Sequence, residues 1–324
     1  MGNIKLNYQQ NETDFSIQGF TEMSGLKIPV FLIFLFIYLF IILGNMTIFV
    51  IIVTDCYLHT PMYIFLMNLS LIDITSTSDI LPKLLNMLLT QNNMISFLEC
   101  VTQMYFFLSM ACAQFILLAA MAYDRYIAIC HPLHYAILMG FRHIAALIII
   151  TWTVGLIDPL PHAFLVSKMA FCVSHVINHL FCDLVPLLKL SCSDTSLVEK
   201  VNYIDGALIP FPALVFTFIS YVFIISAILK IKSVEGRRKA FSTCSSHLLC
   251  VTLYYLTTMC LYMRPTSSYS PKEDKYFALL YIVVVPMLNP VIYSLKNQEV
   301  KKASDRLKNK FAALLTRDSF VFSC

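Results

Sequence analysis

Seven long apolar runs are the feature that most restricts what this chain can fold into. A helix that crosses the hydrocarbon core of a bilayer needs about 20 mostly apolar residues. Charged residues make up only 13% of the 324-residue chain, whereas a soluble domain carries roughly 25%. The sequence therefore predicts an all-α membrane protein, a seven-transmembrane helix bundle with a short amphipathic helix near its C-terminus, over residues 298–315. The expected spans are residues 28–53, 61–89, 97–129, 144–165, 197–229, 246–263 and 276–295.

Basic residues gather on one side of these spans. The stretches 230–239 and 296–317 are rich in Lys and Arg, whereas Asp and Glu balance the basic residues on the other side. Because short cytoplasmic loops carry an excess of Lys and Arg, these stretches are expected in the cytoplasm. The expected organisation is an extracellular N-terminus at 1–27, a seven-transmembrane domain at 28–295, and a cytoplasmic helix and tail at 296–324. No signal peptide is expected, and the first apolar run would serve as an uncleaved signal anchor.

Two features of the expected outer side fit this orientation. Asn11 begins an N-glycosylation sequon and is a candidate for modification. Four cysteines also fall on this side, where an oxidising environment lets disulfides persist. They allow three pairings, and the sequence does not choose among them. The four are Cys100, Cys172, Cys182 and Cys192.

Several motifs bring the chain close to one family. They are PMYIFL at 61–66 with NLSLID at 68–73, MAYDRYIAICHPLHY at 121–135, KAFSTCSSH at 239–247 and PMLNPVIYSLKN at 286–297. Together they resemble the vertebrate odorant (olfactory) receptors of the rhodopsin-like G-protein-coupled receptor class, in the tetrapod-type branch. The resemblance extends from residue 44 to residue 297, and the motifs occur in the family's order.

The resemblance implies a function and a set of partners. It implies a receptor that binds a small, volatile organic ligand in the outer half of the bundle and activates a stimulatory G protein, which raises cAMP. The expected partners are that odorant, the heterotrimeric G protein and membrane lipid, with no nucleic acid, no cofactor, no metal and no catalysis by the chain. The expected location is the plasma membrane, as a multi-pass protein with its N-terminus outside.

The resemblance also assigns roles to individual residues. It pairs Cys100 with Cys182 and Cys172 with Cys192. The implied ligand-binding residues are mostly apolar with a few hydroxyls, as in most small-molecule sites, although an aromatic stripe is more often plain helix packing. They are Phe107, Leu108, Ala111, Cys112, Phe115, Asp205, Ile209, Tyr255, Thr258, Tyr262, Leu279 and Ile282. The residues implied in switching and G-protein coupling are Asp73, Asp124, Arg125, Tyr221, His247, Asn289, Pro290 and Tyr293.

Elementary physics supports several of these roles. Asp73 is an ionisable side chain within a span, which costs roughly 2.5–3.5 kcal/mol on insertion scales and marks either a functional residue or a polar anchor between helices. An exposed Asp124–Arg125 pair contributes about 0–1 kcal/mol, which is weak enough for a ligand to open it. Pro290 lacks an N–H and interrupts the helical hydrogen-bond ladder, which favours a hinge. Gln114 stands where most family members carry Glu, so a sodium site beside Asp73 would lose a charge.

Three further acids lie in the expected outer halves of spans, at Asp79, Asp158 and Asp205. Because mid-span charges call for partners, each is either part of a site or a neutral carboxyl that is hydrogen-bonded to its neighbours, or, for Asp205, a carboxyl at a water-exposed helix start. Phe107 stands where amine-neurotransmitter receptors carry Asp, which argues against that subclass. An Asp205 side chain that faces the cavity would favour ligands with a hydrogen-bond donor or an amine.

Proteins of other classes are the alternatives. A transporter or channel would need a polar path through the bundle, often with inverted repeats or matching broken helices, and the sequence shows no such pattern. An enzyme would need a zinc-ligand cluster, a nucleophile elbow or a phosphate loop, and the sequence has none of these motifs. A rhodopsin-like receptor for a hormone or peptide is the nearest alternative.

Overall fold

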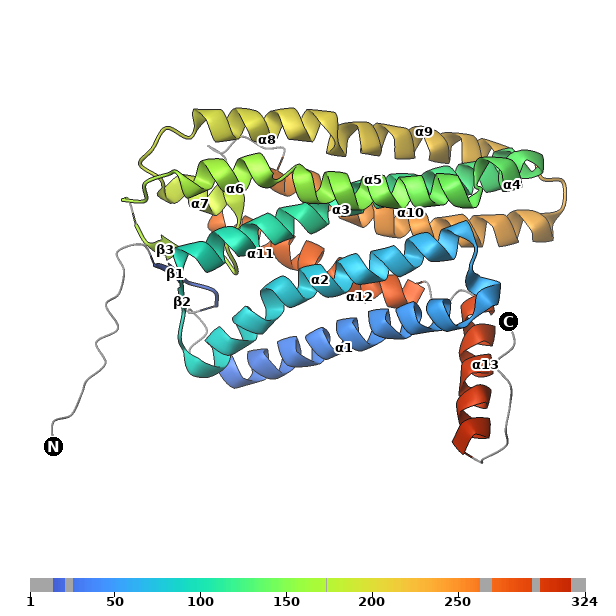
Figure 1. The fold of residues 1–324 in the computed structure, drawn as a ribbon, viewed down its shortest axis with the longest axis horizontal. Helices are drawn as coiled ribbons and strands as arrows, with labels where there is room; N and C mark the ends of the chain where they lie inside the picture. Colours follow the sequence, from blue (N-terminus) through green and yellow to red (C-terminus); the bar gives the residue numbers. More distant parts are fainter. Residues whose placement is uncertain (1–13, 21–25, 173, 263–269, 293–297, 316–324) are drawn as a thin grey trace.

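The computed structural model describes residues 14–20, 26–172, 174–262, 270–292 and 298–315. Its long helices run side by side along one axis, with a small β-sheet at one end of the bundle and the helix α13 at the other (Figure 1). We call these two ends the sheet end and the α13 end. The helix α13 lies across the direction of the bundle rather than along it.

Apolar sequence of sufficient length forms the helices of the bundle. In the described part of the chain, five helical segments are long and apolar enough to cross a membrane. They are α1 (Lys27–Thr54), α2 (Pro61–Thr90), α3 (Phe97–Cys130), α5 with α6 (Phe141–Ile157 and Leu160–Ser167) and α8 with α9 (Ser196–Leu208 and Pro210–Leu229). The helices that complete the bundle are α10 (Val234–Tyr262), α11 (Pro271–Leu279), the π-helical segment η4 (Leu280–Val284) and α12 (Val285–Pro290).

All seven expected spans coincide with helices, so the predicted fold class is confirmed. The largest difference is in the sixth span, where α10 begins at Val234 rather than at residue 246. The residues of its first three turns are mostly polar, so the apolar pattern of the sequence marks only the part of the helix that follows them. The seventh span begins at Pro271 rather than at residue 276 for the same reason. The expected ends at residues 263 and 295 lie outside the described residues.

Two spans are interrupted at prolines. The fourth breaks between Ile157 and Leu160, around Pro159, and the fifth breaks at Ile209, directly before Pro210. Proline has no N–H to donate and its ring clashes with the preceding turn, so a continuous helix is disfavoured at these positions.

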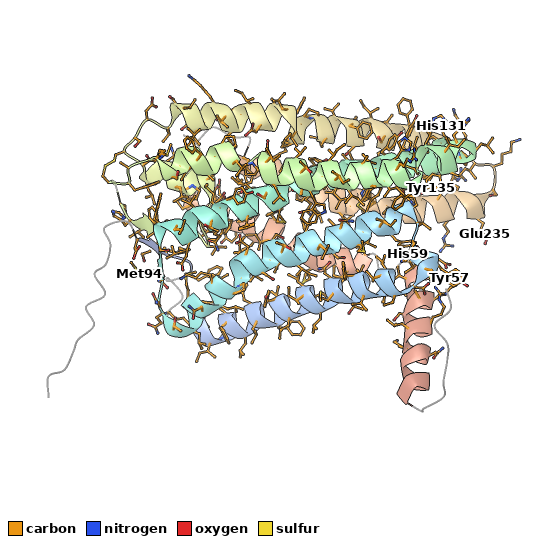
Figure 2. All side chains as sticks on the ribbon, in the orientation of Figure 1. Tyr57, His59, Met94, His131, Tyr135 and Glu235 are labelled. Atoms are coloured by element: carbon orange, nitrogen blue, oxygen red, sulfur yellow. A yellow bond between two sulfur atoms is a disulfide. The ribbon has the colours of Figure 1, made fainter. Side chains whose placement is uncertain are left out.

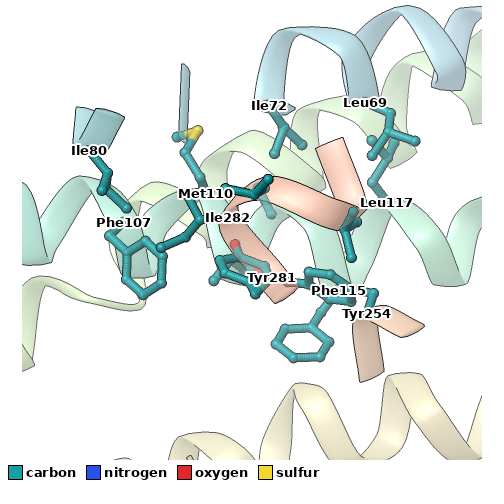
Figure 3. Close-up of a cluster of buried hydrophobic side chains, with 14 of the residues drawn as sticks. Leu69, Ile72, Ile80, Phe107, Met110, Phe115, Leu117, Tyr254, Tyr281 and Ile282 are labelled. Atoms are coloured by element: carbon teal, nitrogen blue, oxygen red, sulfur yellow. Dashed lines mark hydrogen bonds between the residues drawn. The ribbon is translucent and has the colours of Figure 1, made fainter. Parts of the chain in front are cut away.

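The helix α3 occupies the centre of the bundle. In its most apolar stretch 72% of the residues are buried, against 22% for α5 with α6. Small residues let neighbouring helices approach closely, as is common in membranes. A Cβ atom on Gly155 of α5 would lie 2.7 Å from the Cβ of Ala113 in α3. Figure 3 shows the apolar core around this helix, where Phe107 and Phe115 lie close to Tyr281 and Tyr254.

The sheet end is closed by short elements. The strand β1 (Phe15–Ile17) pairs antiparallel with β2 (Met94–Ile95) and parallel with β3 (Val176–Ile177). The helix α7 (Leu184–Leu190) follows β3, and its residues Leu184–Leu188 are buried. Two disulfides stabilise this end, with Cα–Cα distances of 5.3 Å for Cys100–Cys182 and 5.8 Å for Cys172–Cys192. They are the two pairs that the family resemblance implied.

The opposite end carries further short helices. They are η1 (Cys56–Leu58), η2 (Pro132–His134), α4 (Tyr135–Leu138) and the C-terminal α13 (Gln298–Leu315). Figure 2 places Tyr57, His131 and Tyr135 at this end and Met94 at the sheet end.

The amphipathic C-terminal helix is confirmed. Val300 and Ala303 of α13 are buried, whereas Lys301, Lys302 and Lys308 are exposed and Arg306 is partly exposed. The Arg306 Nε atom donates to Oδ2 of Asp55 at 2.8 Å, and its guanidinium lies 5.2 Å from the centre of the Tyr57 ring. These contacts hold α13 to the turn between α1 and α2.

Candidate functional site

A cavity of about 80 Å³ lies between α3, α6, α8 and α10, in the half of the bundle nearer the sheet end (Figure 1). One water-sized group needs about 10–15 Å³ of such space, so the cavity accommodates several. Its apolar wall comes from α3. The residues of this wall are Leu108, Ala111, Cys112 and Phe115. The polar side chains around the remaining walls are Asp158, His162, Asn202, Asp205, Thr258 and Tyr262.

Seven of the twelve implied ligand-binding residues line this cavity. The α3 positions follow helical spacing, which is why the sequence placed them on one face. Thr258 and Tyr262 are one turn apart on α10, and Asp205 comes from α8. The seven are Leu108, Ala111, Cys112, Phe115, Asp205, Thr258 and Tyr262.

The other five implied residues do not line this cavity in the described structure. Phe107 is fully buried, with ring-centroid distances of 4.7 Å to Phe181 and 5.4 Å to Tyr281. Tyr255 packs against the Phe115 ring at 5.3 Å and so supports the cavity from behind. Helical spacing gives the direction of a side chain but not which neighbour it meets. The remaining three are Ile209, Leu279 and Ile282, of which Ile282 also belongs to the core in Figure 3.

Several lining residues were not among those implied by the resemblance. His162 and Asn202 lie on spans whose sequence reads as plain membrane helix, and nothing in the pattern marks them. Asp158 and the prolines did give a signal, because an acid beside a proline within an apolar run indicates an interrupted helix with a polar contact. The added lining residues are Asp158, Pro159, His162, Asn202, Gly206, Pro210 and Met259.

The polar side of the cavity is only partly paired. His162 Nε2 lies 3.4 Å from Asp205 Oδ2, and the Asp158 carboxyl interacts with the Cys112 thiol and with the Asp205 carboxyl. The Nδ1 atom of His162 and the Oδ2 atom of Asp205 are buried and make no hydrogen bond with the described residues. Burial of such groups without a partner costs free energy.

A loop of the sheet end reaches the cavity through one tyrosine. The Tyr262 hydroxyl lies 3.1 Å from each carboxyl oxygen of Asp183 and donates to this carboxyl, which also accepts from the Leu184 N–H at 2.7 Å. Burial raises the pKa of Asp183 to about 6, although both hydrogen bonds act in the opposite direction. Asp183 follows Cys182, whose N–H donates to Gln103 of α3. The loop is therefore fixed to both α3 and α10.

Near the α13 end, the implied switch residues are paired with one another. Arg125 Nε donates to Asp124 Oδ2 at 2.9 Å and Nη2 donates to the same oxygen, whereas the Tyr135 hydroxyl donates to Oδ1 at 2.7 Å. Asp124 is fully buried, and Arg125 is 17% exposed. Tyr221 and His247 form a second buried hydrogen bond between α9 and α10. Tyr135 was not among the implied residues.

A third polar cluster lies at the centre of the bundle. Asn289 Nδ2 donates to Asp73 Oδ2 at 2.7 Å, so α12 is joined to α2 at the residue before Pro290. The Asn45 amide donates to the backbone oxygen of Pro286 instead of to Asp73. Gln114 is buried. Two of the implied positions, the sequon residue Asn11 and the coupling residue Tyr293, lie outside the described residues.

A seven-helix bundle with a cavity near one end and a paired Asp–Arg motif near the other is the arrangement of the G-protein-coupled receptors. The model of the olfactory receptor family matches residues 34–310. The chain is 46% identical over 298 residues to the mouse olfactory receptor 5AR1, which covers 92% of this chain and 96% of that one. It is 46% identical over 295 residues to the mouse olfactory receptor 8U9, covering 91% and 94%. The chain belongs to the olfactory receptor family.

Membership of this family establishes the general function. The protein is a multi-pass receptor of the plasma membrane that responds to small-molecule odorants, couples to a G protein and is not an enzyme. The human olfactory receptor 5AR1, at 45% identity over 298 residues, gives the same assignment.

Proposed function

We propose that a small, volatile odorant binds in the cavity between α3, α6, α8 and α10, and that its binding activates a stimulatory G protein and raises cAMP. The observation that carries this proposal is the cavity itself, because its α3 wall presents Leu108, Ala111, Cys112 and Phe115 together. Such a site combines apolar surface with a few polar groups that orient the ligand, which is the usual composition of small-molecule sites.

The proposed orientation places the sheet end outside the cell and the α13 end in the cytoplasm. The segments 230–238 and 301–308 hold Lys230, Lys232, Arg237 and Arg238 in the first and Lys301, Lys302, Arg306 and Lys308 in the second. Both segments lie at the α13 end, and an excess of basic residues favours the cytoplasmic side. In this orientation α13 lies along the inner leaflet, where each basic residue contributes about 1 kcal/mol near anionic lipid.

This orientation assigns each segment of the chain to the membrane or to one side of it. Residues 1–27 would be extracellular, with Asn11 glycosylated, residues 28–295 would form the membrane domain, and residues 296–324 would be cytoplasmic. Arg125 would then lie where a G protein can reach it, and Asp73, Tyr221, His247, Asn289, Pro290 and Tyr293 would transmit the change from the cavity to Arg125.

The test begins with a panel of volatile compounds applied to cells that express the full-length receptor, with cAMP as the readout. Leu108→Trp should fill the cavity and abolish the response to every active compound at unchanged surface level. The matched control is Phe106→Trp, because Phe106 is two residues away on α3 but faces outward, with 40% of its surface exposed. Equal loss in both variants, or in neither, would contradict the proposed location. A response that persists in cells without the stimulatory Gα subunit would contradict the proposed coupling.

A further inference from the structure

Acidic side chains outnumber basic ones on the polar side of the cavity. Two acidic residues line the same cavity, Asp158 from the end of α5 and Asp205 from the last turn of α8. In the described structure no Lys or Arg lines this cavity, and His162 is its one basic side chain. With both carboxyls ionised, even a protonated His162 leaves the cavity with a net negative charge.

His162 supplies a second observation that points to a ligand. Its side chain is 5% exposed and lines the cavity, and its Nδ1 atom makes no hydrogen bond with the described residues. Among the described residues its one ionic contact joins Nε2 to Asp205 Oδ2 at 3.4 Å, which is longer than a charge-assisted hydrogen bond. The Asp205 Oδ2 atom is buried and likewise makes no hydrogen bond in the described part of the chain.

Each of the two acids lies close to a proline at a helix break. Asp158 is the last residue before Pro159, and Asp205 is five residues before Pro210. Both prolines also line the cavity. Asp158 is the C-cap of α5 and Asp205 lies in the last turn of α8, so each acid lines the cavity from the end of a helix.

We propose that this cavity selects small aliphatic amines in their protonated form, with the ammonium group between Asp158 and Asp205. The inference rests on the proposed function, because it specifies the ligand of the same site. An ammonium group has three N–H donors and no acceptor, so it can satisfy acceptors on both carboxyls at once. Its short alkyl chain would then lie against the apolar α3 wall of Leu108, Ala111 and Phe115.

The same chemistry excludes other ligand classes. A carboxylate ligand would place a third negative charge beside the two acids, and like charges disfavour one another strongly where water is excluded. An alcohol of equal length can donate one hydrogen bond but cannot neutralise either acid. A hydrocarbon would supply neither a hydrogen-bond donor nor a positive charge to either acid. We therefore expect the order of potency to be amine, alcohol, then hydrocarbon, with the carboxylic acid inactive.

The experiment compares n-butylamine, 1-butanol, pentane and butanoic acid on cells that express the full-length receptor at matched surface levels. Asp205→Asn and Asp158→Asn should each reduce butylamine potency by about tenfold or more, the loss expected for a hydrogen bond between charged groups. The response to butanol should change much less. Asp205→Glu keeps the charge and should retain the preference for the amine. Glu199→Gln is the matched control, because Glu199 lies on α8 but does not line the cavity, and it should leave all responses unchanged.

The outcomes separate this inference from the proposed function. If butanol activates the receptor and Leu108→Trp abolishes the response, but butylamine is no more potent and Asp205→Asn has no effect, the amine inference is overturned and the proposed site stands. If the parent responds to none of the straight-chain amines from propylamine to hexylamine, the inference is also overturned. If butylamine is preferred but Leu108→Trp leaves its potency unchanged, the amine binds elsewhere, and both the inference and the proposed site fail.

Discussion

The cavity beside α3 and the Asp124–Arg125 motif near the α13 end differ in how their polar groups are paired. At the cavity, the buried Nδ1 of His162 and Oδ2 of Asp205 make no hydrogen bond with the described residues. Near the α13 end, both carboxyl oxygens of Asp124 have partners, since Arg125 donates to one and Tyr135 to the other. The cavity therefore has unused hydrogen-bonding capacity, whereas the proposed release of Arg125 would first have to break these interactions.

This difference fits a receptor in which the two regions respond to different partners. A ligand that enters the cavity can add interactions without breaking many, so its binding free energy is available to shift a conformational equilibrium. A ligand shifts such an equilibrium only by the difference in its affinity for the two states. In the proposed mechanism the Asp124–Arg125–Tyr135 cluster would set the free-energy cost that this difference must offset, and the G protein would bind the released form.

The largest effect is expected from removal of the Arg125 guanidinium. Arg125→Ala should abolish ligand-stimulated cAMP, because the proposed contact with the G protein is lost, while the surface level stays close to that of the parent. The control is Arg142→Ala, which removes an exposed basic residue at the start of α5. Cell-surface labelling together with cAMP measurement distinguishes the two. A normal cAMP response of Arg125→Ala at matched surface level would remove Arg125 from the coupling mechanism.

A smaller effect of opposite sign is expected from Tyr135→Phe. This change removes the hydroxyl that donates to Asp124 Oδ1 at 2.7 Å and leaves the ring in place. A buried hydrogen bond to a charged group contributes about 1.5–3 kcal/mol, so loss of it should favour the released state and raise ligand-independent cAMP several-fold. Tyr126→Phe, which breaks the nearby bond to His131, should leave basal cAMP unchanged. Unaltered basal cAMP in Tyr135→Phe would show that this cluster does not restrain the receptor.

A change at the boundary of the cavity tests whether the loop takes part in binding. Tyr262→Phe removes the hydroxyl that donates to Asp183 and should lower the potency of an active ligand about fivefold, the equivalent of about 1 kcal/mol. The maximal response should stay the same, because the coupling end is untouched. Tyr276→Phe alters an exposed tyrosine of α11 and serves as the control. If the maximal response fell and the potency did not, Tyr262 would belong with the switch residues rather than with the cavity.

The smallest effect concerns pH and the stability of the sheet end. The pKa of Asp183 is raised from 3.8 to about 6 by burial, so the folded state binds this proton more tightly than the unfolded state. Its stabilising contribution is complete below the unfolded pKa and is lost as the pH rises through about 6. The purified receptor should therefore melt a few degrees higher at pH 5 than at pH 7.5, and Asp183→Asn should reduce this difference. If parent and variant showed the same pH dependence of melting, Asp183 would not be the group whose protonation stabilises the receptor.

The sequence by itself determined the class of fold. Apolar runs of sufficient length form helices in a membrane whatever their neighbours, because each helix satisfies its own backbone hydrogen bonds. The amphipathic pattern of residues 298–315 and the positions of the proline breaks are local properties of the same kind. The motifs around Arg125 and Asn289 then fixed the family, since each is long and the order is that of the olfactory receptors.

Only the tertiary structure decided which side chains share a space. The sequence predicted the α3 face that includes Leu108 and Phe115. It did not predict that Phe107 is buried away from the cavity, because this depends on its packing against Phe181 and Tyr281. The contacts of His162 with Asp205 and of Tyr262 with Asp183 join residues 43 and 79 positions apart. Such pairings depend on the rotation and closeness of packed helices, which contacts such as Gly155 against Ala113 set and which no local pattern records.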